Sequence, residues 1–385
     1  MVDRNVTIVG GGPVGLLAAL AAVAEGLTPH VFERRTGPRG GSRSIGVHPP
    51  ALEILERLGL LSRFVANGVL VRRGLAFGED GPLGAIDFGS CRGMHRYVLT
   101  IPQRDTESIL WEALEARAPG AVTAGWDLLD IHDHAGRLRL SFRDLEGRRR
   151  HVDPDVVLAC DGKRSRIRAF LGMGFRGAEY EGGYAMADFP DTTKFGADAA
   201  IFLNPRGLVE SFPLPGRMRR WVIRRDAEHD EFVTADEIVE TINERTHHRL
   251  QPADAVDASA FRAERYLASS LSHGAVALAG DAAHVVSPIG GQGMNLGWIG
   301  AAQIVHALAC ADADAASVES ALHVDAAQRR RAARAAIRRA EVNMWLGRPM
   351  DQPRLRERFV RALLGRPAAD VLAHVFTMRG LAWGV

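Results

Sequence analysis

A glycine-rich turn near the N-terminus places the strongest constraint on how this chain can fold. Gly10-Gly-Gly-Pro-Val-Gly15 directly follows a short apolar run at residues 6–9 and precedes an apolar helical pattern at residues 16–25. A second apolar run, residues 29–32, then ends at Glu33. This is a GxGxxG sequence inside a strand–helix–strand unit, with an acid placed where it can bind a ribose hydroxyl. The N-terminal segment therefore predicts a dinucleotide site, for either a flavin or a nicotinamide.

The three spaced glycines have separate expected roles. Gly10 allows the tight turn, Gly12 lets the pyrophosphate approach the backbone, and Gly15 allows the helix to pack closely on the strand. A similar spacing at residues 172–177 follows a helix and is followed by no helical pattern or suitably placed acid. We interpret that second match as a turn, so the chain is predicted to contain one dinucleotide fold.

Two further strand ends carry acids. Residues 155–160 form an apolar run that ends at Asp161-Gly162, with Ser165 and Arg168 in a short helix beyond it. Residues 275–279 form another, which ends at Gly280-Asp281. Gly290, Gly291 and Gly293 follow, and residues 294–308 have a helical pattern. Backbone N–H groups at such a loop and helix start converge on an electron-rich ligand, so we expect this segment to complete the site.

The composition argues against several other classes. A net charge of +2, 46% hydrophobic and 24% charged residues are ordinary for a globular protein, so neither nucleic acid nor an integral membrane segment is expected. Lys163 and Lys194 are the only lysines, which leaves few candidates for lysine catalysis. The three cysteines are far apart, so we expect no disulfide framework and no metal site, and we predict a cytoplasmic protein.

Taken in order, these motifs resemble the FAD-dependent monooxygenases of the para-hydroxybenzoate hydroxylase type, the group A flavoprotein aromatic hydroxylases. The resemblance rests on Gly10-x-Gly-x-x-Gly15 with Glu33, on residues 161–168, and on residues 280–295. It extends to about residue 308. Because about 100 residues follow Asp281, we expect the compact branch without a thioredoxin-like C-terminal domain.

The resemblance implies an α/β fold: a Rossmann-type FAD-binding βαβ domain with an interleaved antiparallel-sheet substrate domain and a helical C-terminus. The expected divisions are 1–75, 98–175 and 265–320 for the discontinuous FAD-binding domain, 76–97 and 176–264 for the substrate sheet, and 321–385 for the C-terminal helices.

The resemblance also implies specific cofactor contacts. Glu33 would bind the adenosine ribose, Arg43 the pyrophosphate side and Asp281 the ribityl and pyrophosphate region, while Gln103 would approach the ribityl chain. Pro288 would lie beside the flavin ring and is the one candidate catalytic residue. The full expected FAD set is Gly10, Gly12, Pro13, Val14, Gly15, Glu33, Arg34, Arg43, Gln103, Asp161, Asp281, Pro288, Gly291, Gly293, Met294 and Asn295.

The implied reaction consumes NADPH or NADH and O2 and oxygenates a small aromatic or polyketide-like substrate through a flavin C4a-hydroperoxide. A flavin-dependent halogenase, an FAD-dependent reductase or dehydrogenase of an isoprenoid, and a non-catalytic FAD-binding protein stay open as alternatives. His284 is either a base or a histidine held by backbone bonding. Homodimer formation also stays open.

Substrate contacts are expected on the two β-rich segments, residues 70–100 and 180–225. Pro213, Pro215 and Gly216 predict a hairpin within the second segment. The candidate substrate residues are its large aromatics, Tyr184, Phe202, Phe212 and Trp221.

Overall fold

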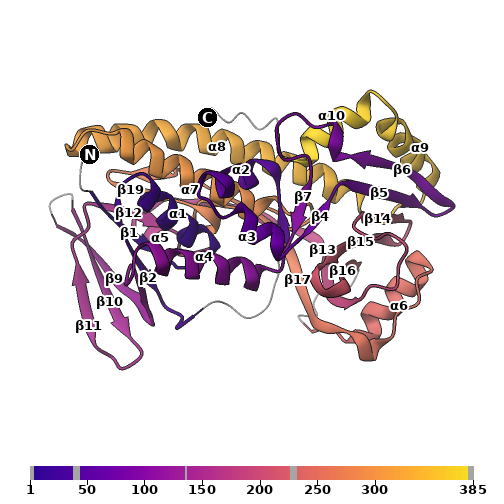
Figure 1. The fold of residues 1–385 in the computed structure, drawn as a ribbon, viewed down its shortest axis with the longest axis horizontal. Helices are drawn as coiled ribbons and strands as arrows, with labels where there is room; N and C mark the ends of the chain where they lie inside the picture. Colours follow the sequence, from indigo (N-terminus) through magenta and orange to yellow (C-terminus); the bar gives the residue numbers. More distant parts are fainter. Residues whose placement is uncertain (1–3, 38–43, 135–136, 226–231, 380–385) are drawn as a thin grey trace.

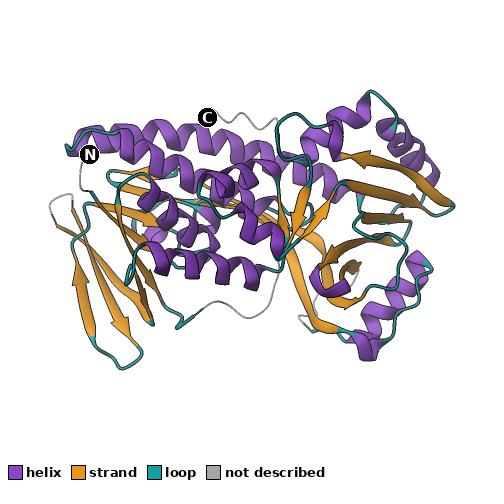
Figure 2. Ribbon diagram, in the orientation of Figure 1, coloured by secondary structure: helices purple, strands orange, loops and turns teal. Residues whose placement is uncertain are grey.

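The chain folds into two sheet-based parts that share a helical layer (Figures 1 and 2). A computed structural model describes residues 4–37, 44–134, 137–225 and 232–379. The helices in these ranges are α1 Pro13–Ala24, α2 Pro49–Arg57, α3 Leu61–Ala66, α4 Gln103–Arg117, α5 Arg166–Phe170, α6 Ala235–Thr246, α7 Gln292–Cys310, α8 Ala315–Leu346, α9 Pro353–Leu364 and α10 Ala368–Phe376.

The first part is built on a mostly parallel six-stranded sheet in the order β18-β19-β12-β1-β2-β8. Parallel pairing joins β1 to β2 and β12, and β12 to β19, so these four strands end at the same edge. The strands are β1 Asn5–Val9, β2 Thr28–Glu33, β8 Val122–Ala124, β12 Val156–Ala159, β18 Ser272–His273 and β19 Val276–Leu278.

Both faces of this sheet are covered, which explains the nearly continuous apolar runs in its strands. Val6 and Ile8 pack on the side of α1, α2, α4 and α7. Val9 and Phe32 point to the opposite side, where Phe142 stacks on Phe32 with ring centroids 4.0 Å apart. That side is covered by a three-stranded antiparallel sheet of β9 Trp126–His134, β10 Arg137–Asp144 and β11 Arg149–Val152.

The second part is built on an eight-stranded sheet in the order β20-β17-β13-β16-β15-β14-β5-β6. The strands are β5 Arg73–Gly78, β6 Gly81–Asp87, β13 Phe175–Pro190, β14 Ala199–Asn204, β15 Gly207–Leu214, β16 Met218–Arg225, β17 Val256–Ala268 and β20 His284–Val285. A small sheet of β3 Gly46–Val47, β7 Val98–Thr100 and β4 Val69–Val71 lies between the two parts.

Helix α8 connects the two parts along one side of the molecule (Figure 1). Ala326, in its first half, packs in the core beneath the parallel sheet, and Met344, near its end, packs against the eight-stranded sheet. The sequence does not mark α8 as a shared element, because its arginine-rich composition resembles that of a solvated helix.

The predicted fold class is confirmed. The first βαβ unit, the antiparallel hairpin of β15 and β16, and the long helix after the glycine loop all form as expected. The domain division stays a proposal. The strand arrangement supports it, although β5 begins at Arg73, within the range assigned to the FAD-binding domain.

Residues 172–177 do not form a second dinucleotide turn. Gly172 lies in a turn after α5, and Phe175 already begins the long strand β13. Within the described residues, no helix combines the length and apolarity that a membrane crossing requires.

The contact between α7 and the first glycine turn provides a test of the fold. Trp298 is fully buried, and its indole Nε1 donates to the Pro13 carbonyl oxygen at 3.0 Å. We expect Trp298→Phe to lower the free energy of unfolding by about 1–3 kcal/mol, because it removes this hydrogen bond and leaves a small cavity where the buried indole ring was. Trp345→Phe is the matched control, since Trp345 is 49% exposed, and it should change stability by less than about 0.5 kcal/mol. Equal effects in urea denaturation would contradict the assignment.

Candidate active site

A large cavity lies at the edge where β1, β2, β12 and β19 end. Its volume is about 1250 Å³, and it extends from the first glycine turn to the eight-stranded sheet and the C-terminal helices. Ligand pockets usually measure about 300–1000 Å³, so this cavity has room for more than one small molecule. Its lining consists of backbone-rich loops at the end near the parallel sheet and of apolar side chains at the other end.

The first glycine turn is held in a conformation that only glycine can adopt there. Gly10 has φ +105°, and a Cβ on Gly15 would lie 1.9 Å from the Gly10 carbonyl oxygen. A Cβ on Gly12 would meet nothing within 4 Å, and Gly12 lines the cavity. The turn therefore presents open backbone to a ligand at the start of α1, where a helix favours negative charge.

Glu33 is fixed by hydrogen bonds at the end of β2. Its carboxylate accepts from the Gly11 N–H at 2.6 Å, the Arg35 N–H at 2.9 Å and the Arg35 Nε at 2.8 Å. Burial alone would raise the pKa of Glu33, but the bonds from Arg35 and Gly11 outweigh it and lower the pKa. An ionised carboxylate at this position is a suitable acceptor for a ribose hydroxyl.

Asp161 and Arg168 lie after β12, and Arg168 connects this segment to the loop after β19. One Asp161 oxygen accepts from the Arg166 N–H at 2.9 Å, while its Oδ1 is buried and has no partner within the described residues. Burial raises the pKa of Asp161. Arg168 donates to the Ala282 carbonyl at 2.9 Å and to the Lys163 carbonyl at 2.7 Å. The arginine thus holds the two acidic loops together.

The loop before α7 is fixed by Asn295. The Asn295 amide donates to the Gly46 carbonyl at 2.8 Å and the Gly291 carbonyl at 2.7 Å, and it accepts from the His48 N–H at 2.8 Å. The His48 ring also contacts the Gly290 carbonyl at 3.1 Å, and burial lowers its pKa to about 4. Asn295 itself does not line the cavity, so it acts by shaping the loop whose residues Gly293 and Met294 do.

The eight-stranded sheet has one face toward the cavity and one away from it. Side chains alternate between faces along a strand, so Glu210 and Phe212 share the cavity face of β15. Phe202 and Trp221 lie on the opposite face, which packs against α6. Their expected role as substrate contacts is therefore corrected. Tyr184 lies on the cavity side of the sheet but is buried beneath Met344. Its hydroxyl donates to the Met344 sulfur at 3.4 Å.

The C-terminal helices close the far end of the cavity. Phe359 and Leu364 on α9 and Leu372 and Phe376 on α10 contribute apolar lining.

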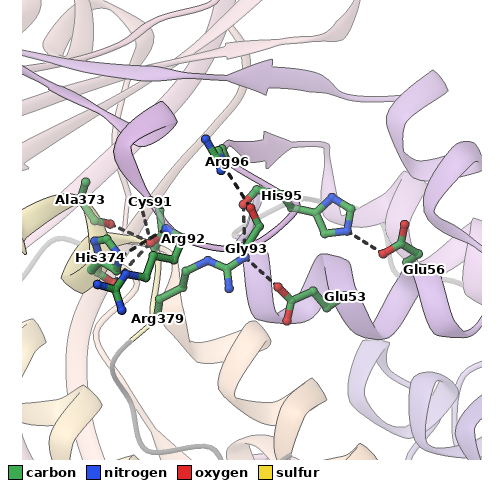
Figure 3. A network of polar contacts seen from close by, with 11 residues as sticks. Glu53, Glu56, Cys91, Arg92, Gly93, His95, Arg96, Ala373, His374 and Arg379 are labelled. Atoms are coloured by element: carbon green, nitrogen blue, oxygen red, sulfur yellow. Dashed lines mark hydrogen bonds and ion pairs between the residues drawn. The ribbon is translucent and has the colours of Figure 1, made fainter. Parts of the chain in front are cut away.

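Polar contacts of α10 and of the residues just after it anchor this wall (Figure 3). Arg379 donates to Glu53 on α2 at 2.7 Å, and the Arg92 N–H donates to the His374 Nε2 at 3.3 Å. His95 contacts Glu56 on α2 at 3.0 Å. The motifs in the sequence do not indicate this wall.

Most of the residues expected to bind the cofactor line this one cavity. They are Gly10, Gly12, Pro13, Val14, Gly15, Glu33, Arg34, Gln103, Asp161, Asp281, Pro288, Gly291, Gly293 and Met294. Arg43 lies outside the described residues. His284 is buried away from the cavity lining, its backbone pairs with Leu267, and burial lowers its pKa to about 4. Within the described ranges, no cluster of metal-ligating side chains occurs.

These residues fit FAD on structural grounds. The open backbone at Gly12 suits a pyrophosphate, and the ionised Glu33 at the end of β2 suits an adenosine ribose. The unpartnered Asp161 Oδ1 leaves one acceptor in the cavity wall. The start of α7, with Gly293 and Met294 in the lining, supplies a helix N-terminus for a ring that gains negative charge on reduction.

Comparison with known proteins identifies the same cofactor. Residues 3–340 match the FAD binding domain family. Pentachlorophenol 4-monooxygenase of Sphingobium chlorophenolicum is 30% identical over 77% of this chain and 56% of its own length. Rifampicin monooxygenase of Streptomyces venezuelae is 30% identical over 76% of this chain and 61% of its own length. The chain thus spans little more than half of these relatives.

Solved structures share the fold over almost the whole chain. The p-nitrophenol 4-monooxygenase PnpA of Pseudomonas putida DLL-E4 covers 99% of both chains with a TM-score of 0.85 and 21% identity. The anhydrotetracycline hydroxylase OxyS of Streptomyces rimosus aligns with 98% of this chain and 76% of its own, with a TM-score of 0.77 and 26% identity.

The hydrogen bonds to Glu33 generate a prediction with a defined pH dependence. Because the folded-state pKa lies below the ordinary value of 4.5, ionised Glu33 stabilises the fold above that pH. This contribution is lost as the pH falls through the lowered pKa. We expect Glu33→Gln to cost about 1.5–3 kcal/mol at neutral pH and progressively less below about pH 4. Denaturation curves across this range measure it.

The exposed carboxylate Glu112, which pairs with Arg63, provides the control. Glu112→Gln should cost less than about 1 kcal/mol. A Glu33→Gln penalty that stayed constant down to about pH 2 would refute the ionised-carboxylate assignment.

Proposed function

The chain belongs to the FAD binding domain family, and from this premise we propose that it is an FAD-dependent monooxygenase that uses NAD(P)H and O2. The proposal rests on one observation: the same cavity joins the cofactor loops to an apolar chamber at the eight-stranded sheet. Curated relatives that match most of this chain are monooxygenases of aromatic and polyketide compounds, which supports the same reaction class.

In this proposal FAD supplies the redox and oxygen-activating chemistry, and the protein positions it and excludes water. Glu33 and the glycine turn hold the adenosine and pyrophosphate end. Asp281, just after β19, and Gln103, at the start of α4, hold the ribityl and pyrophosphate region of FAD. Pro288 and the backbone of residues 291–294 form the wall against the flavin ring.

The apolar chamber supports an aromatic or polyketide-like substrate. The cavity face of the sheet contributes Ile201, Leu208, Phe212 and Val222, and helices α9 and α10 close the opposite side. Such walls bind a flat apolar molecule and exclude bulk water. We retain Phe212 as the one substrate contact among the aromatics expected from the sequence. A homodimer and a cytoplasmic location stay predictions from the sequence.

Oxygen incorporation tests the proposed reaction directly. The FAD-loaded protein, supplied with NADPH or NADH and a panel of phenols in an atmosphere of ¹⁸O2, should give a product that carries one labelled oxygen atom. Mass spectrometry of the product measures it. NAD(P)H-dependent conversion to an unlabelled product would instead identify a reductase and overturn the proposal.

Asp281 provides the test of cofactor binding. We expect Asp281→Ala to weaken FAD binding about 10- to 100-fold, because hydrogen bonds to a charged group contribute about 1.5–3 kcal/mol. Flavin absorbance after dialysis and titration of the apoprotein with FAD measure the change. Asp254→Ala, in the exposed turn before β17, is the control and should bind FAD as the wild type does. Full FAD retention in Asp281→Ala would contradict the assigned contact.

A further inference from the structure

One buried acid on the substrate side of the cavity has no role in cofactor binding. Glu210 lies in the middle of β15, between the cavity-lining side chains of Leu208 and Phe212. It pairs across the sheet with Val222 on one side and Ile201 on the other, and both of these residues also line the cavity. An acid at the centre of this apolar floor is unexpected from packing alone.

The Glu210 carboxyl group is buried without compensation. The residue is 5% exposed, and within the described residues its carboxyl group makes no hydrogen bond or ion pair. Burial raises the pKa of Glu210 to about 7. An unpaired buried carboxyl group costs free energy in either protonation state, which a ligand with a hydrogen-bond donor can recover.

The charged and titratable groups around Glu210 make their hydrogen bonds to groups other than its carboxylate, although the Nε atoms of Arg224 and Arg356 have no partner among the described residues. On β16, Arg220 binds both oxygens of Asp188 at 2.7 and 2.8 Å, and Arg224 donates to the Glu181 carbonyl at 3.4 Å. Tyr184 on β13 donates to Met344, and its pKa is raised to about 12, mainly by burial.

Two arginines that follow α8 are the remaining charged groups considered around Glu210. Arg348 acts electrostatically on Tyr184, and Arg356 on α9 donates to the Leu203 carbonyl at 2.7 Å. Among the described residues, no cation is therefore directed at the Glu210 carboxylate, which leaves it open to a partner that enters the cavity.

We propose that Glu210 recognises the substrate by accepting a hydrogen bond from a hydroxyl group on a neutral phenolic ring. This inference rests on the proposed function, because it assigns the substrate class of the same cavity. In the complex the phenol O–H donates to the carboxylate, the proton stays shared between the two oxygens, and electron density on the ring increases. A ring richer in electrons is more readily oxygenated.

The same arrangement selects against aromatic acids at this position. A carboxylate beside Glu210 would meet a like charge, and the Arg220 guanidinium that could neutralise it is bound to Asp188. The preferred substrate is a phenol whose remaining surface is apolar, which matches the walls formed by Leu208, Phe212 and the C-terminal helices.

Binding of a matched pair of ligands tests the proposal without turnover. We would measure 1-naphthol and its methyl ether, 1-methoxynaphthalene, by calorimetry with the FAD-loaded protein in the absence of NAD(P)H. At about pH 8 the wild type should bind 1-naphthol at least about tenfold more tightly, since one charge-assisted hydrogen bond is lost in the ether. The ratio should fall below about pH 7, because the protonated carboxyl group can donate to the ether oxygen.

Two substitutions separate this role from a structural one. Glu210→Leu should bring the ratio of the two affinities close to one at every pH, and it should fold, since it replaces an unpaired buried acid by an apolar side chain of similar size. Glu210→Gln should give a ratio that does not change with pH. Glu264→Gln is the control, because the Glu264 carboxylate is already paired with Lys163, and it should keep the pH dependence.

A wild-type ratio in Glu210→Leu, a persistent pH dependence in Glu210→Gln, or no binding of either ligand by the wild type would overturn the inference. FAD content and thermal unfolding are compared for all variants. The two proposals fail separately. Unlabelled product from ¹⁸O2 with an intact naphthol preference rejects only the monooxygenase reaction, whereas labelled product with an unchanged ratio in the variants rejects only the role of Glu210.

Discussion

The close approach of α1 and α7 is the constraint on which the whole site depends. A Cβ on Gly297 would lie 2.7 Å from a Val14 methyl carbon and 3.2 Å from the Gly280 Cα, so any side chain at this position would push the two helices apart. The Trp298 indole completes the contact by donating to the Pro13 carbonyl. Because α1 begins at the first glycine turn and α7 at the last one, this packing joins segments that are separated by 285 positions in the sequence.

The cofactor side of the cavity was largely predictable because it depends on the backbone. A tight turn, a helix start and a strand end impose residue types such as Gly10, Gly15 and Glu33 at fixed spacings, and these spacings are visible in the sequence. The contacts that stabilise the loops were not predictable. Asn295 was expected only as a member of the FAD set, and its sequence position did not show that its side-chain amide donates to the carbonyl groups of Gly46 and Gly291. No local pattern shows which distant carbonyl groups an amide will meet.

The substrate side was less predictable because it depends on which face of each strand packs against a helix and which face meets the cavity. Aromatic size suggested Phe202 and Trp221, yet both pack beneath the sheet against α6. The informative signal was the single acid in the apolar run Gly207–Leu214, which the search for aromatics passed over. Alternation places Glu210 on the same face as Phe212, but only the fold shows that this face meets the cavity rather than α6.

Glu33 on the cofactor side and Glu210 on the substrate side are held in opposite ways, and this difference follows from what each must do. At the end of β2, Glu33 is ionised and held by hydrogen bonds from Gly11 and Arg35, so its orientation is set before any ligand arrives. On the sheet floor Asp188 and Arg220 neutralise each other, whereas the Glu210 carboxyl group has no partner in the part of the chain that the structure describes. A preformed backbone cradle suits a cofactor that stays bound. An unpaired acid in an apolar wall suits a ligand that enters, supplies the missing hydrogen bond and leaves. The cost of burying Glu210 is thus a selectivity device, since only a ligand with a donor at that position removes it.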